Sequence, residues 1–433
     1  MPITSLPARF FLLLALLLAA ASAGAATGGA DATGGAAATG RTAAPGSGPG
    51  GGPQLAARSA ILLEEVTGTV LYEYHADEPI PPASLTKLMT LHLALRAIEE
   101  GRLEPSEVLV PGPDAWARNM PPRSSLMFLG PNQKLTVAQL LKGLVVDSGN
   151  DAAMEVADRV AGSVPAFVDM MNREAVRLGY RVMHFVEPSG ISASNRVTAR
   201  EYAEFARRFI ALHPDSLSEL FSVREFTYPL QENLTGDNRQ KPVTQSNRNV
   251  LLGRYEGVDG LKTGYIDESG YNIAVTAERD GMRLVCVILG VVDSHGLSGA
   301  VLRATESARL LDYGYGEFVL IRPSYEPPAA PHVWKGAART VRVAPSPAPV
   351  VVVPKEQASA LTASVIQDLD LEAPVRAGQV VGAVVVSVGG REIARFPLRA
   401  AAEVARGNFL RRALDSIVLF ARGITPVRPV DAP

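Results

Sequence analysis

The sequence predicts an α/β protein of the α+β type, in which strands from both ends of one domain form an antiparallel sheet and helices occupy the segment between them. Apolar runs bounded by turn residues occur near residue 60 and again between residues 260 and 289. Between these two regions, apolar residues recur at the three- and four-residue spacing of helices. Because the two β-rich regions enclose the helices, their strands are expected to pair across the domain.

The main domain is expected to begin with a β-hairpin followed by a helix. The runs 60–63 and 69–72 are separated by the turn Thr67-Gly68. A helix then follows Pro82 and ends near Gly101, since Leu, Met and Ile side chains recur along one face. Further helices are expected up to about residue 222, including 137–146, 151–160 and 165–178.

The β pattern then returns, and one more helix completes the domain. Strands are expected at 260–265, 272–276 and 283–289, followed by a helix over 300–311. Beyond a proline-rich link, short β-branched runs predict a small all-β domain without evident chemistry. These runs are 340–343, 350–353, 380–388 and 392–396, with a turn at Gly389-Gly390 between the last two.

Composition divides the chain into five segments. Near the start, Arg9 precedes an apolar run that ends at the small residues Ala21-Ser22-Ala23, which is typical of a cleaved export signal, with a retained membrane anchor as the alternative. Gly, Ala, Thr, Ser and Pro dominate the next thirty residues, which predicts a flexible tether. The expected segments are a signal peptide (1–23), a tether (24–53), a main domain (54–322), a small β domain (323–400) and an amphipathic helix (404–422).

Composition also excludes several classes of function. The 433 residues carry a formal net charge of -2, from 42 basic and 44 acidic residues, so no electrostatic field favours nucleic acid. Cys286 is the only cysteine, which excludes an intrachain disulfide and a cysteine-based metal site, and no histidine lies in a His-Glu-x-x-His motif. Because Cys286 lies within an apolar run, we expect a buried, inert thiol. Neither a metal nor an organic cofactor is expected.

The C-terminal segment predicts a helix that lies on a membrane surface. From Phe409 to Ala421, apolar residues recur at helical spacing while arginines gather on the other side. The stripe spans about four turns, roughly 20 Å, and is therefore too short and too charged to cross a bilayer. Its arginine face suits anionic headgroups, whereas the alternative is a helix that docks on the protein itself.

The first motif with potential chemistry is the pair Ser84 and Lys87, three positions apart at the start of the first predicted helix. This spacing places both side chains on one helix face, so the amine can reach the serine oxygen. A lysine whose pKa is lowered by burial or by nearby positive charge can take the serine proton. Taken alone, such a pair is more often a helix-capping serine followed by a surface lysine.

Two further motifs follow in order, 64 and then 114 residues later. Ser148-Gly149-Asn150 lies between two predicted helices and, by itself, resembles a turn with a helix cap. Lys262-Thr263-Gly264 lies on a predicted strand, where the glycine admits a ligand backbone and the other two side chains can hold a carboxylate. The chain has seven lysines against 35 arginines, and arginine cannot act as a base, so a lysine in two motifs favours chemistry over solvation.

Together, the three motifs resemble those of penicillin-binding proteins and class A β-lactamases. The sequence is most similar to the low-molecular-mass penicillin-binding proteins, which are serine-type D-alanyl-D-alanine carboxypeptidases, and the resemblance extends from about Arg58 to the C-terminal helix. It implies a penicillin-binding, β-lactamase-like transpeptidase domain with a helical subdomain, followed by a β domain and a membrane-associating helix. The segments that resemble the family most closely are 82–87, 114–117, 124–129 and 258–264.

The resemblance also implies a role for each motif residue. Ser84 would be the acylated nucleophile, Lys87 its base, and Ser148 a proton relay to the leaving group. The backbone N–H groups of Ser84 and of the strand near Tyr265 would form the oxyanion hole. Lys262 would lower the pKa of Lys87 by like-charge repulsion. The implied substrate-binding residues are Asn150, Lys262, Thr263, Gly264 and Arg303.

The implied activity is removal of the terminal D-alanine from peptidoglycan stem peptides through an acyl-enzyme, with β-lactams as covalent inhibitors. The implied location is the periplasmic face of the bacterial inner membrane, where the exported protein would be held peripherally by its C-terminal helix. Tyr265, Glu187 and Ser189 depart from the family pattern, which often has histidine, asparagine and histidine at these positions.

Three alternatives stay open: a class A-like β-lactamase, a D,D-endopeptidase and a non-catalytic cell-wall binding protein. A β-lactamase would need a Glu-x-x-Leu-Asn stretch to activate its water, and Glu187 lies at a suitable distance past Ser148. The Leu-Asn pair does not follow it, however, which argues against this alternative.

Overall fold

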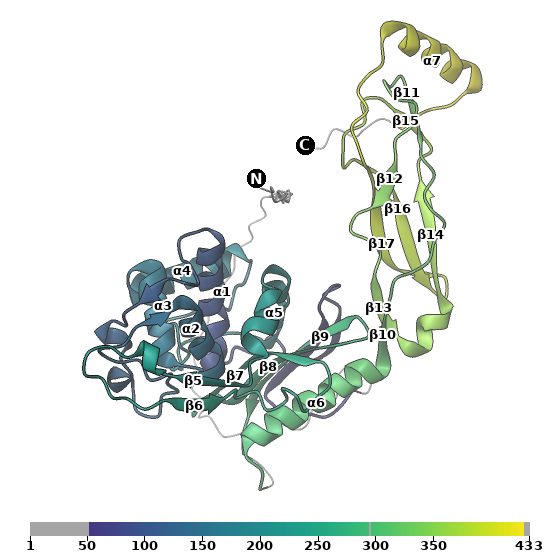
Figure 1. Cartoon of the computed structure of the whole chain (residues 1–433). Helices are drawn as coiled ribbons and strands as arrows, with labels where there is room; N and C mark the ends of the chain where they lie inside the picture. The colour runs from purple at the N-terminus through teal and green to yellow at the C-terminus, as the bar shows by residue number, and fades with distance from the viewer. Residues whose placement is uncertain (1–51, 294–295, 428–433) are drawn as a thin grey trace, which may run out of the picture. The chain divides into compact units, whose positions relative to one another are not determined.

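The computed structural model describes residues 52–293 and 296–427 (Figure 1). The predicted signal peptide and residues 24–51 of the predicted tether lie outside the described residues. The described chain forms a mixed α/β domain, an all-β domain and a C-terminal amphipathic helix, as the sequence predicted.

The main sheet has five antiparallel strands in the order β2-β1-β9-β8-β7. β1 pairs with β9 along its whole length, from Ser59 opposite Leu289 to Glu64 opposite Leu284. Both the predicted hairpin and the predicted pairing of distant strands are therefore confirmed. The strands are β1 (Ser59–Glu64), β2 (Val70–Tyr74), β7 (Val258–Ile266), β8 (Gly270–Arg279) and β9 (Met282–Val291).

Alternate residues of these strands face two separate cores, as the two-residue period of a strand requires. Ile61 and Leu63 belong to the core that includes side chains of α1 (Lys87–Glu99) and α5 (Ala199–Leu212), whereas Leu62 belongs to the core that includes side chains of α6 (Gly299–Glu317). These helices lie on the two faces of the sheet (Figure 1). Cys286 lies in this second core, where burial raises the pKa of its thiol to about 12. The expectation of a buried, inert thiol is confirmed.

Among the described residues, the main domain has six α-helices, and the predicted helical stretch 137–146 changes its winding part of the way along. After α2 the chain continues as a π-helical segment, Gly143–Asp147, where Gly143 leaves room for the side chain of Met127. This segment ends at Ser148, whose backbone is left-handed (φ 59). The helices are α1 (Lys87–Glu99), α2 (Val137–Lys142), α3 (Asn150–Ala161), α4 (Val164–Arg177), α5 (Ala199–Leu212) and α6 (Gly299–Glu317). Short strands accompany them: β3 (Val108–Leu109), β4 (Leu135–Thr136), β5 (Glu225–Tyr228) and β6 (Val243–Ser246).

The C-terminal part contains an antiparallel sheet in the order β12-β17-β16-β14, with the pairs β10-β13 and β11-β15 beside it. The predicted turn at Gly389-Gly390 joins β16 and β17. The segment 340–343 is mostly irregular, because the Val341 N–H bonds to a loop carbonyl, that of Pro331. The elements are β10 (Phe318–Ile321), β11 (His332–Trp334), β12 (Val343–Pro345), β13 (Val351–Pro354), β14 (Leu361–Gln367), β15 (Asp370–Glu372), β16 (Val380–Val388), β17 (Arg391–Ala400) and α7 (Phe409–Arg422).

Candidate active site

Ser84 lies in a single 3-10 turn, Ala83–Thr86, that leads directly into α1. Two glycines allow other segments to approach its backbone. A Cβ on Gly264 of β7 would lie 2.9 Å from the Ser84 nitrogen, and a Cβ on Gly190 would overlap the Ala83 carbonyl. Gly190 also has a φ of +87°, which side chains rarely adopt. Ser84 is therefore enclosed between an edge strand and a loop, and its position depends on both glycines.

Lys87 is the first residue of α1, and its amine is buried against three oxygen atoms. The Nζ atom lies 3.0 Å from Ser84 Oγ, 2.8 Å from Asn150 Oδ1 and 2.6 Å from the Ser189 carbonyl oxygen. The side chain is 2% exposed. Burial is the largest cause of its lowered pKa, about 7, against the opposing effect of the Glu187 and Asp151 carboxylates.

This arrangement of oxygens suits a neutral amine. The Ser189 carbonyl and Asn150 Oδ1 only accept hydrogen bonds, while a serine hydroxyl can also donate one. A neutral amine has two N–H groups, which match the two acceptors, and one lone pair, which is then left for the Ser84 hydroxyl proton. Lys87 thus has the geometry and the pKa of a base for Ser84 at neutral pH.

The second and third motifs meet beside this pair. Ser148 Oγ accepts a hydrogen bond of 2.9 Å from Lys262 Nζ, and both residues are buried. Burial first, and then the positive charge of Lys87, lower the pKa of Lys262 well below its usual value. For Lys87 the main cause is burial, and the positive charge that adds to it is that of Arg248.

Asp147 is a buried carboxyl group directly before Ser148. Among the described residues, its Oδ1 atom has no hydrogen-bond partner. Burial, with a contribution from Asp151, raises the pKa of Asp147 to about 8. The side chain is therefore mostly protonated at neutral pH.

Arg303 of α6 lies behind β7, where it supports the strand that carries the third motif. Its guanidinium donates to the carbonyl oxygens of Gly264, at 2.9 Å, and Asn272, at 3.3 Å. Burial is the main cause that lowers the pKa of Arg303 to about 10. Thr263, between Lys262 and Gly264, is also buried.

Arg248 is a further cation near the site that the motifs did not reveal. Its positive charge contributes to the lowered pKa values of Lys87, Lys262 and Arg303. The neighbouring Asn247 and Asn249 fix its backbone: Asn249 Nδ2, for example, donates to the Gly260 carbonyl at 3.1 Å. The sequence signal is the Asn-Arg-Asn triplet, since paired asparagines often order a turn around the residue between them.

Glu187 organises the loop that contacts Lys87. One carboxylate oxygen accepts hydrogen bonds from the Ser189 N–H and hydroxyl, at 2.7 and 2.6 Å. The other accepts from the Gly190 N–H at 2.7 Å and from Asn195 Nδ2 at 2.9 Å. Because both oxygens bind the loop itself, Glu187 has a structural position, which argues against its use as a water-activating base.

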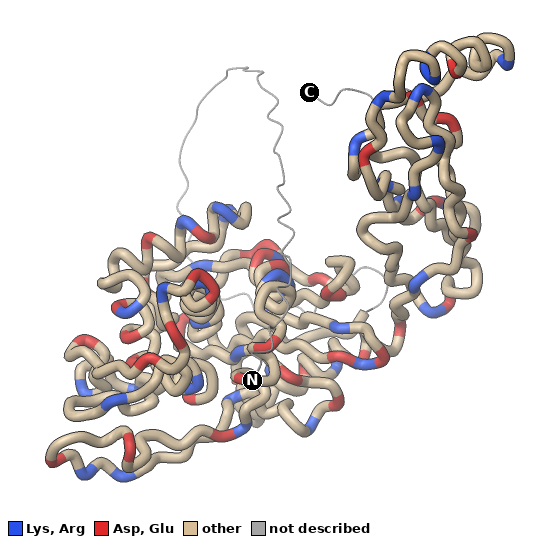
Figure 2. Tube along the Cα trace, turned by 45° about the horizontal axis from the view of Figure 1, so that its top comes forward, with Lys and Arg blue, Asp and Glu red and all other residues tan. Residues whose placement is uncertain are grey.

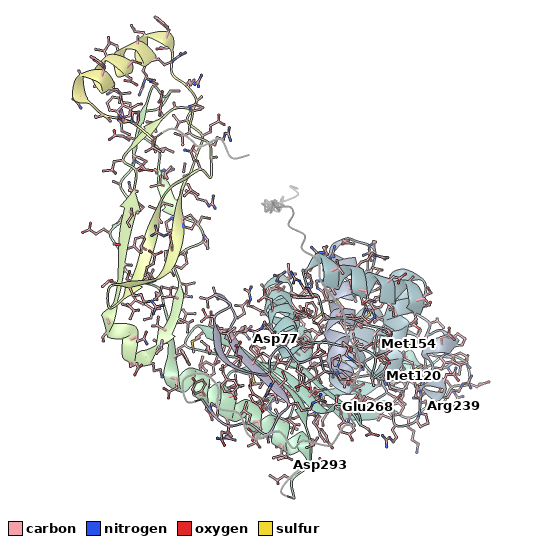
Figure 3. The ribbon with its side chains drawn as sticks, turned by 180° about the vertical axis from the view of Figure 1, so that it is seen from behind. Asp77, Met120, Met154, Arg239, Glu268 and Asp293 are labelled. Atoms are coloured by element: carbon pink, nitrogen blue, oxygen red, sulfur yellow. The ribbon has the colours of Figure 1, made fainter. Side chains whose placement is uncertain are left out.

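An open cleft of about 350 Å³ begins at Ser84. One wall is the segment 122–125, which follows Met120, and the other is the segment 265–268 at the end of β7, which includes Glu268 (Figure 3). Arg123 and Asp267 form an ion pair of 2.8 Å between the two walls, and the Tyr265 hydroxyl donates to Asp267 at 2.8 Å. Tyr265 therefore contributes to the rim of the cleft.

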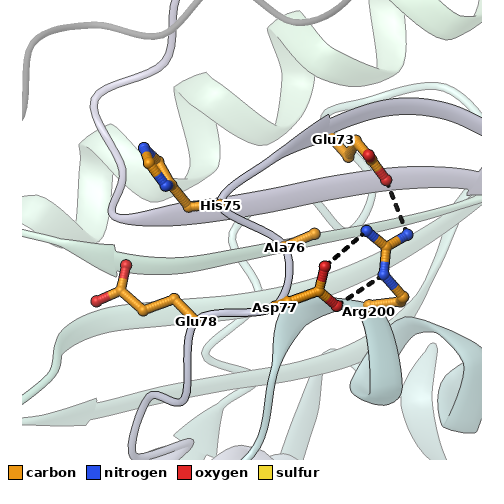
Figure 4. A pocket seen from close by; sticks show the side chains of 6 residues that line it. All are labelled: Glu73, His75, Ala76, Asp77, Glu78 and Arg200. Atoms are coloured by element: carbon orange, nitrogen blue, oxygen red, sulfur yellow. Dashed lines mark hydrogen bonds and ion pairs between the residues drawn. The ribbon is translucent and has the colours of Figure 1, made fainter.

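A second hollow, of about 550 Å³, lies elsewhere on the main domain, and its lining has no pair of side chains comparable to Ser84 and Lys87. Its charged groups are already paired, since Arg200 binds the carboxylates of Asp77 and Glu73, each at 2.8 Å (Figure 4). Basic and acidic residues are interspersed over the main domain (Figure 2), in keeping with the small net charge. Within the described ranges, no group of histidine, cysteine and acidic side chains is arranged to hold a metal ion.

A serine beside a buried lysine with a lowered pKa, at the head of a cleft and next to a cluster of cations, is the arrangement of a serine-type acyl-transferring enzyme. The comparisons with known proteins agree with this class. The family model described as D-alanyl-D-alanine carboxypeptidase matches residues 47–293, and the model described as penicillin-binding protein 5, C-terminal domain, matches residues 326–406.

Three individual proteins illustrate the similarity. D-alanyl-D-alanine carboxypeptidase DacC of Escherichia coli is 34% identical over 375 residues, which cover 85% of this chain and 89% of that protein. The crystal structure of penicillin-binding protein 5 from Haemophilus influenzae aligns with a TM-score of 0.71 and 30% identity, covering 82% of this chain and 99% of that one. Penicillin-binding protein D2 from Listeria monocytogenes, in its cefotaxime-bound form, aligns with a TM-score of 0.52 and 29% identity over 61% of this chain and 98% of that one.

The chain therefore belongs to the D-alanyl-D-alanine carboxypeptidase family. It is a serine-type carboxypeptidase, a hydrolase that binds penicillin, and the resemblance found in the sequence is confirmed.

Proposed function

We propose that Ser84 is the acylated nucleophile and that Lys87 is its general base, in a reaction that removes the terminal D-alanine from peptidoglycan stem peptides. The observation that carries this proposal is the environment of the Lys87 amine, which lies 3.0 Å from Ser84 Oγ and has a pKa of about 7. As Ser84 Oγ bonds to the carbonyl carbon of the penultimate D-alanine, its proton moves to Lys87 Nζ.

The oxyanion that forms in this step needs hydrogen-bond donors. We assign this role to the backbone N–H groups of Ser84 and Tyr265. The contact between Gly264 and the Ser84 nitrogen supports the assignment, because it brings β7 beside the nucleophile. β7 is also the edge strand of the main sheet, so it can pair with an extended substrate backbone.

The leaving amine needs a proton when the peptide bond breaks. Ser148 can relay it, because its hydroxyl can donate its own proton to the amine and take up the proton that Lys87 removed from Ser84, which returns Lys87 to its neutral form. Free D-alanine then departs. Lys87 next takes a proton from the attacking water and passes it to Ser84 Oγ as the acyl bond breaks. Asn150, whose Oδ1 accepts from Lys87, can donate from its Nδ2 group to the substrate's amide carbonyl.

The carboxylate of the terminal D-alanine would be held by Lys262 and Thr263, with Arg248 and Arg303 adding positive charge. Burial and neighbouring cations lower the pKa of Lys262, so in the free enzyme this amine favours its neutral form. A bound carboxylate opposes those cations and raises the pKa of Lys262, which then takes up a proton and forms an ion pair. Substrate binding is thus expected to be accompanied by proton uptake.

The experiment is D-alanine release from a muropeptide with a pentapeptide stem, compared between wild type and Ser84→Ala. We expect release by the wild type alone, with both proteins equally folded by circular dichroism. Release by Ser84→Ala at the wild-type rate would refute the nucleophile assignment. Cleavage of cross-linked stems in the same assay would show D,D-endopeptidase activity.

The proposal extends to the location of the enzyme. We infer an exported protein with a signal peptide (1–23), a tether (24–53), a catalytic domain (54–322), a β domain (323–400) and a membrane-associating helix (404–422), held at the periplasmic face of the bacterial inner membrane. Phe409 and Phe420 support a helix that lies on the surface of a bilayer, since they are 81% and 92% exposed on one side of α7. In the part of the chain that the structure describes, none of the helices has the length and apolarity needed to span a membrane.

Truncation after Arg406 tests the attachment. The shortened enzyme should move from the membrane fraction to the soluble fraction and keep its D-alanine release, because α7 contributes no residue to the cleft. Continued membrane association of the truncated enzyme after signal cleavage would rule out α7 as the anchor.

A further inference from the structure

α7 is fixed to the β domain along one side. Asp415 Oδ2 accepts a hydrogen bond of 2.5 Å from the Lys335 N–H, and Leu419 is buried. Backbone bridges hold the chain on both sides of the helix, between Gly336 and Arg406 before it and between Leu371 and Val427 after it. The orientation of α7 about its own axis is therefore set by its contacts with the β domain.

The opposite side of α7 is an exposed apolar stripe. At about 100° per residue, the centre of this stripe lies roughly 180° from Asp415 and Leu419. When the stripe is buried in a bilayer, the membrane therefore contacts α7 on the side away from the β domain. The members of the stripe are Phe409, Leu410, Leu414, Ile417 and Phe420.

A hollow of about 340 Å³ lies on one flank, between the docked side and the stripe. Arg412 and Ser416 line it from successive turns of α7, and Phe409 borders both the hollow and the stripe. Lys335, Glu372 and Arg406 line it from the β domain and the segment before α7. We call it the cationic hollow, because it contains three basic side chains and one acidic one; basic residues on and just before α7 are visible in Figure 2.

The charges of the cationic hollow are unbalanced. Lys335 Nζ already binds the Glu372 carboxylate at 2.8 Å. Among the described residues, no acidic side chain forms an ion pair with Arg406 or Arg412, so two guanidinium groups keep their donors for an external anion. Guanidinium groups bind phosphate oxygens with two parallel hydrogen bonds, which a point charge does not offer.

We propose that the cationic hollow binds the phosphate group of an anionic phospholipid. This proposal rests on the membrane attachment of α7 given above. When the stripe enters the acyl chains, the flank that holds Arg412 lies at the level of the headgroups. The bound headgroup then connects α7, through Arg412, to the segment before it, through Arg406, and it fixes the depth of the helix in the membrane.

The test is co-sedimentation of the processed chain (residues 24–433) with vesicles of phosphatidylglycerol and phosphatidylcholine. Arg412→Gln removes a charge from the hollow, and Arg422→Gln is the matched control, with the same charge change on the other flank of the same helix. If the helix is attracted only by diffuse charge, each variant should lose the same affinity for the vesicles, about fivefold. If the hollow holds a phosphate by hydrogen bonds to a charged group, the vesicle affinity of Arg412→Gln should fall by roughly 10- to 100-fold, while that of the control falls by about fivefold.

Equal losses for the two variants, with matching thermal unfolding, would overturn the proposal while leaving membrane attachment intact. No sedimentation of the wild type would instead overturn the attachment, and the proposal with it. Titration with inorganic phosphate in the absence of vesicles separates the two sources of the anion. We expect no saturable binding below millimolar concentrations, and tight binding that Arg412→Gln abolishes would assign the hollow to a free anion and refute the lipid proposal.

Discussion

The change of Lys87 to arginine separates the two roles that a lysine can have beside Ser84. If Lys87 only supplies positive charge, arginine replaces it. If Lys87 takes a proton, it must be neutral for part of the time, which an arginine with a pKa above about 12 cannot be. Burial lowers the pKa of Lys87 to about 7, so roughly half of the amine is neutral at pH 7.

The structure gives the size of the effect. An amine with the usual pKa of 10.5 would be neutral in roughly three molecules out of 10⁴ at pH 7, so burial enlarges the reactive fraction by about 10³. A positioned base contributes about 10²- to 10⁴-fold to a reaction rate. We therefore expect the acylation rate constant of Lys87→Arg to fall by at least about 10²-fold.

The assay is the time course of labelling with a fluorescent penicillin between pH 5 and pH 9. Because the neutral form is the base, wild-type acylation should rise with pH around an apparent pKa near 7, and lose roughly tenfold for each unit well below it. A Lys87→Arg variant within about tenfold of wild type at neutral pH, below the range of a general base, would refute this role, as would a flat wild-type profile.

Three further predictions concern the surroundings of Ser84. Gly264→Ala should slow acylation and lower Tm, because its Cβ would lie 2.8 Å from the Pro82 carbonyl; an unchanged rate would exclude the tight approach of β7. Lys262→Gln should raise KM for D-alanine release, and an unchanged KM would remove this residue from the carboxylate site. Glu187→Gln should slow acylation by roughly tenfold or more, because the loop beneath Lys87 loses a charged acceptor; wild-type rates would make that loop dispensable.

Local patterns were sufficient to predict most of the main domain. The β1 hairpin and the return strands β8 and β9 have apolar runs with clear turns, and their pairing is confirmed. β14 was not predicted, although its burial alternates with the two-residue period of a strand, because it lacks the continuous β-branched run from which its neighbours were identified. The helical stretch 137–146 is confirmed in extent, but its change from α- to π-helical winding at Gly143 was not predicted. Gly143 leaves room there for Met127, which comes from a separate segment of the chain.

In the candidate site, too, the residues in local motifs could be predicted, while effects that depend on contacts between segments could not. Ser84, Lys87, Ser148, Asn150 and Lys262 could be named because each lies in a recognisable motif. Hydrogen bonds join Lys87 to Ser84 and Asn150, and a separate one joins Lys262 to Ser148. The effect of Arg248 depends on folding, because it acts on Lys87 and Arg303, which are distant in the sequence. Glu187 bonds within its own loop, but the contact of that loop with Lys87 joins separate segments of the chain. For the same reason, the main cause of the lowered Lys87 pKa, its burial, became visible only in the folded chain.

The most direct test of the account is peptide mass spectrometry of the enzyme after incubation with penicillin. The account predicts a single adduct on the peptide that contains Ser84, and no adduct in the Ser84→Ala variant. An adduct on Ser148 or on any other residue, or one that persists in Ser84→Ala, would contradict the assignment of Ser84 as the acylated nucleophile.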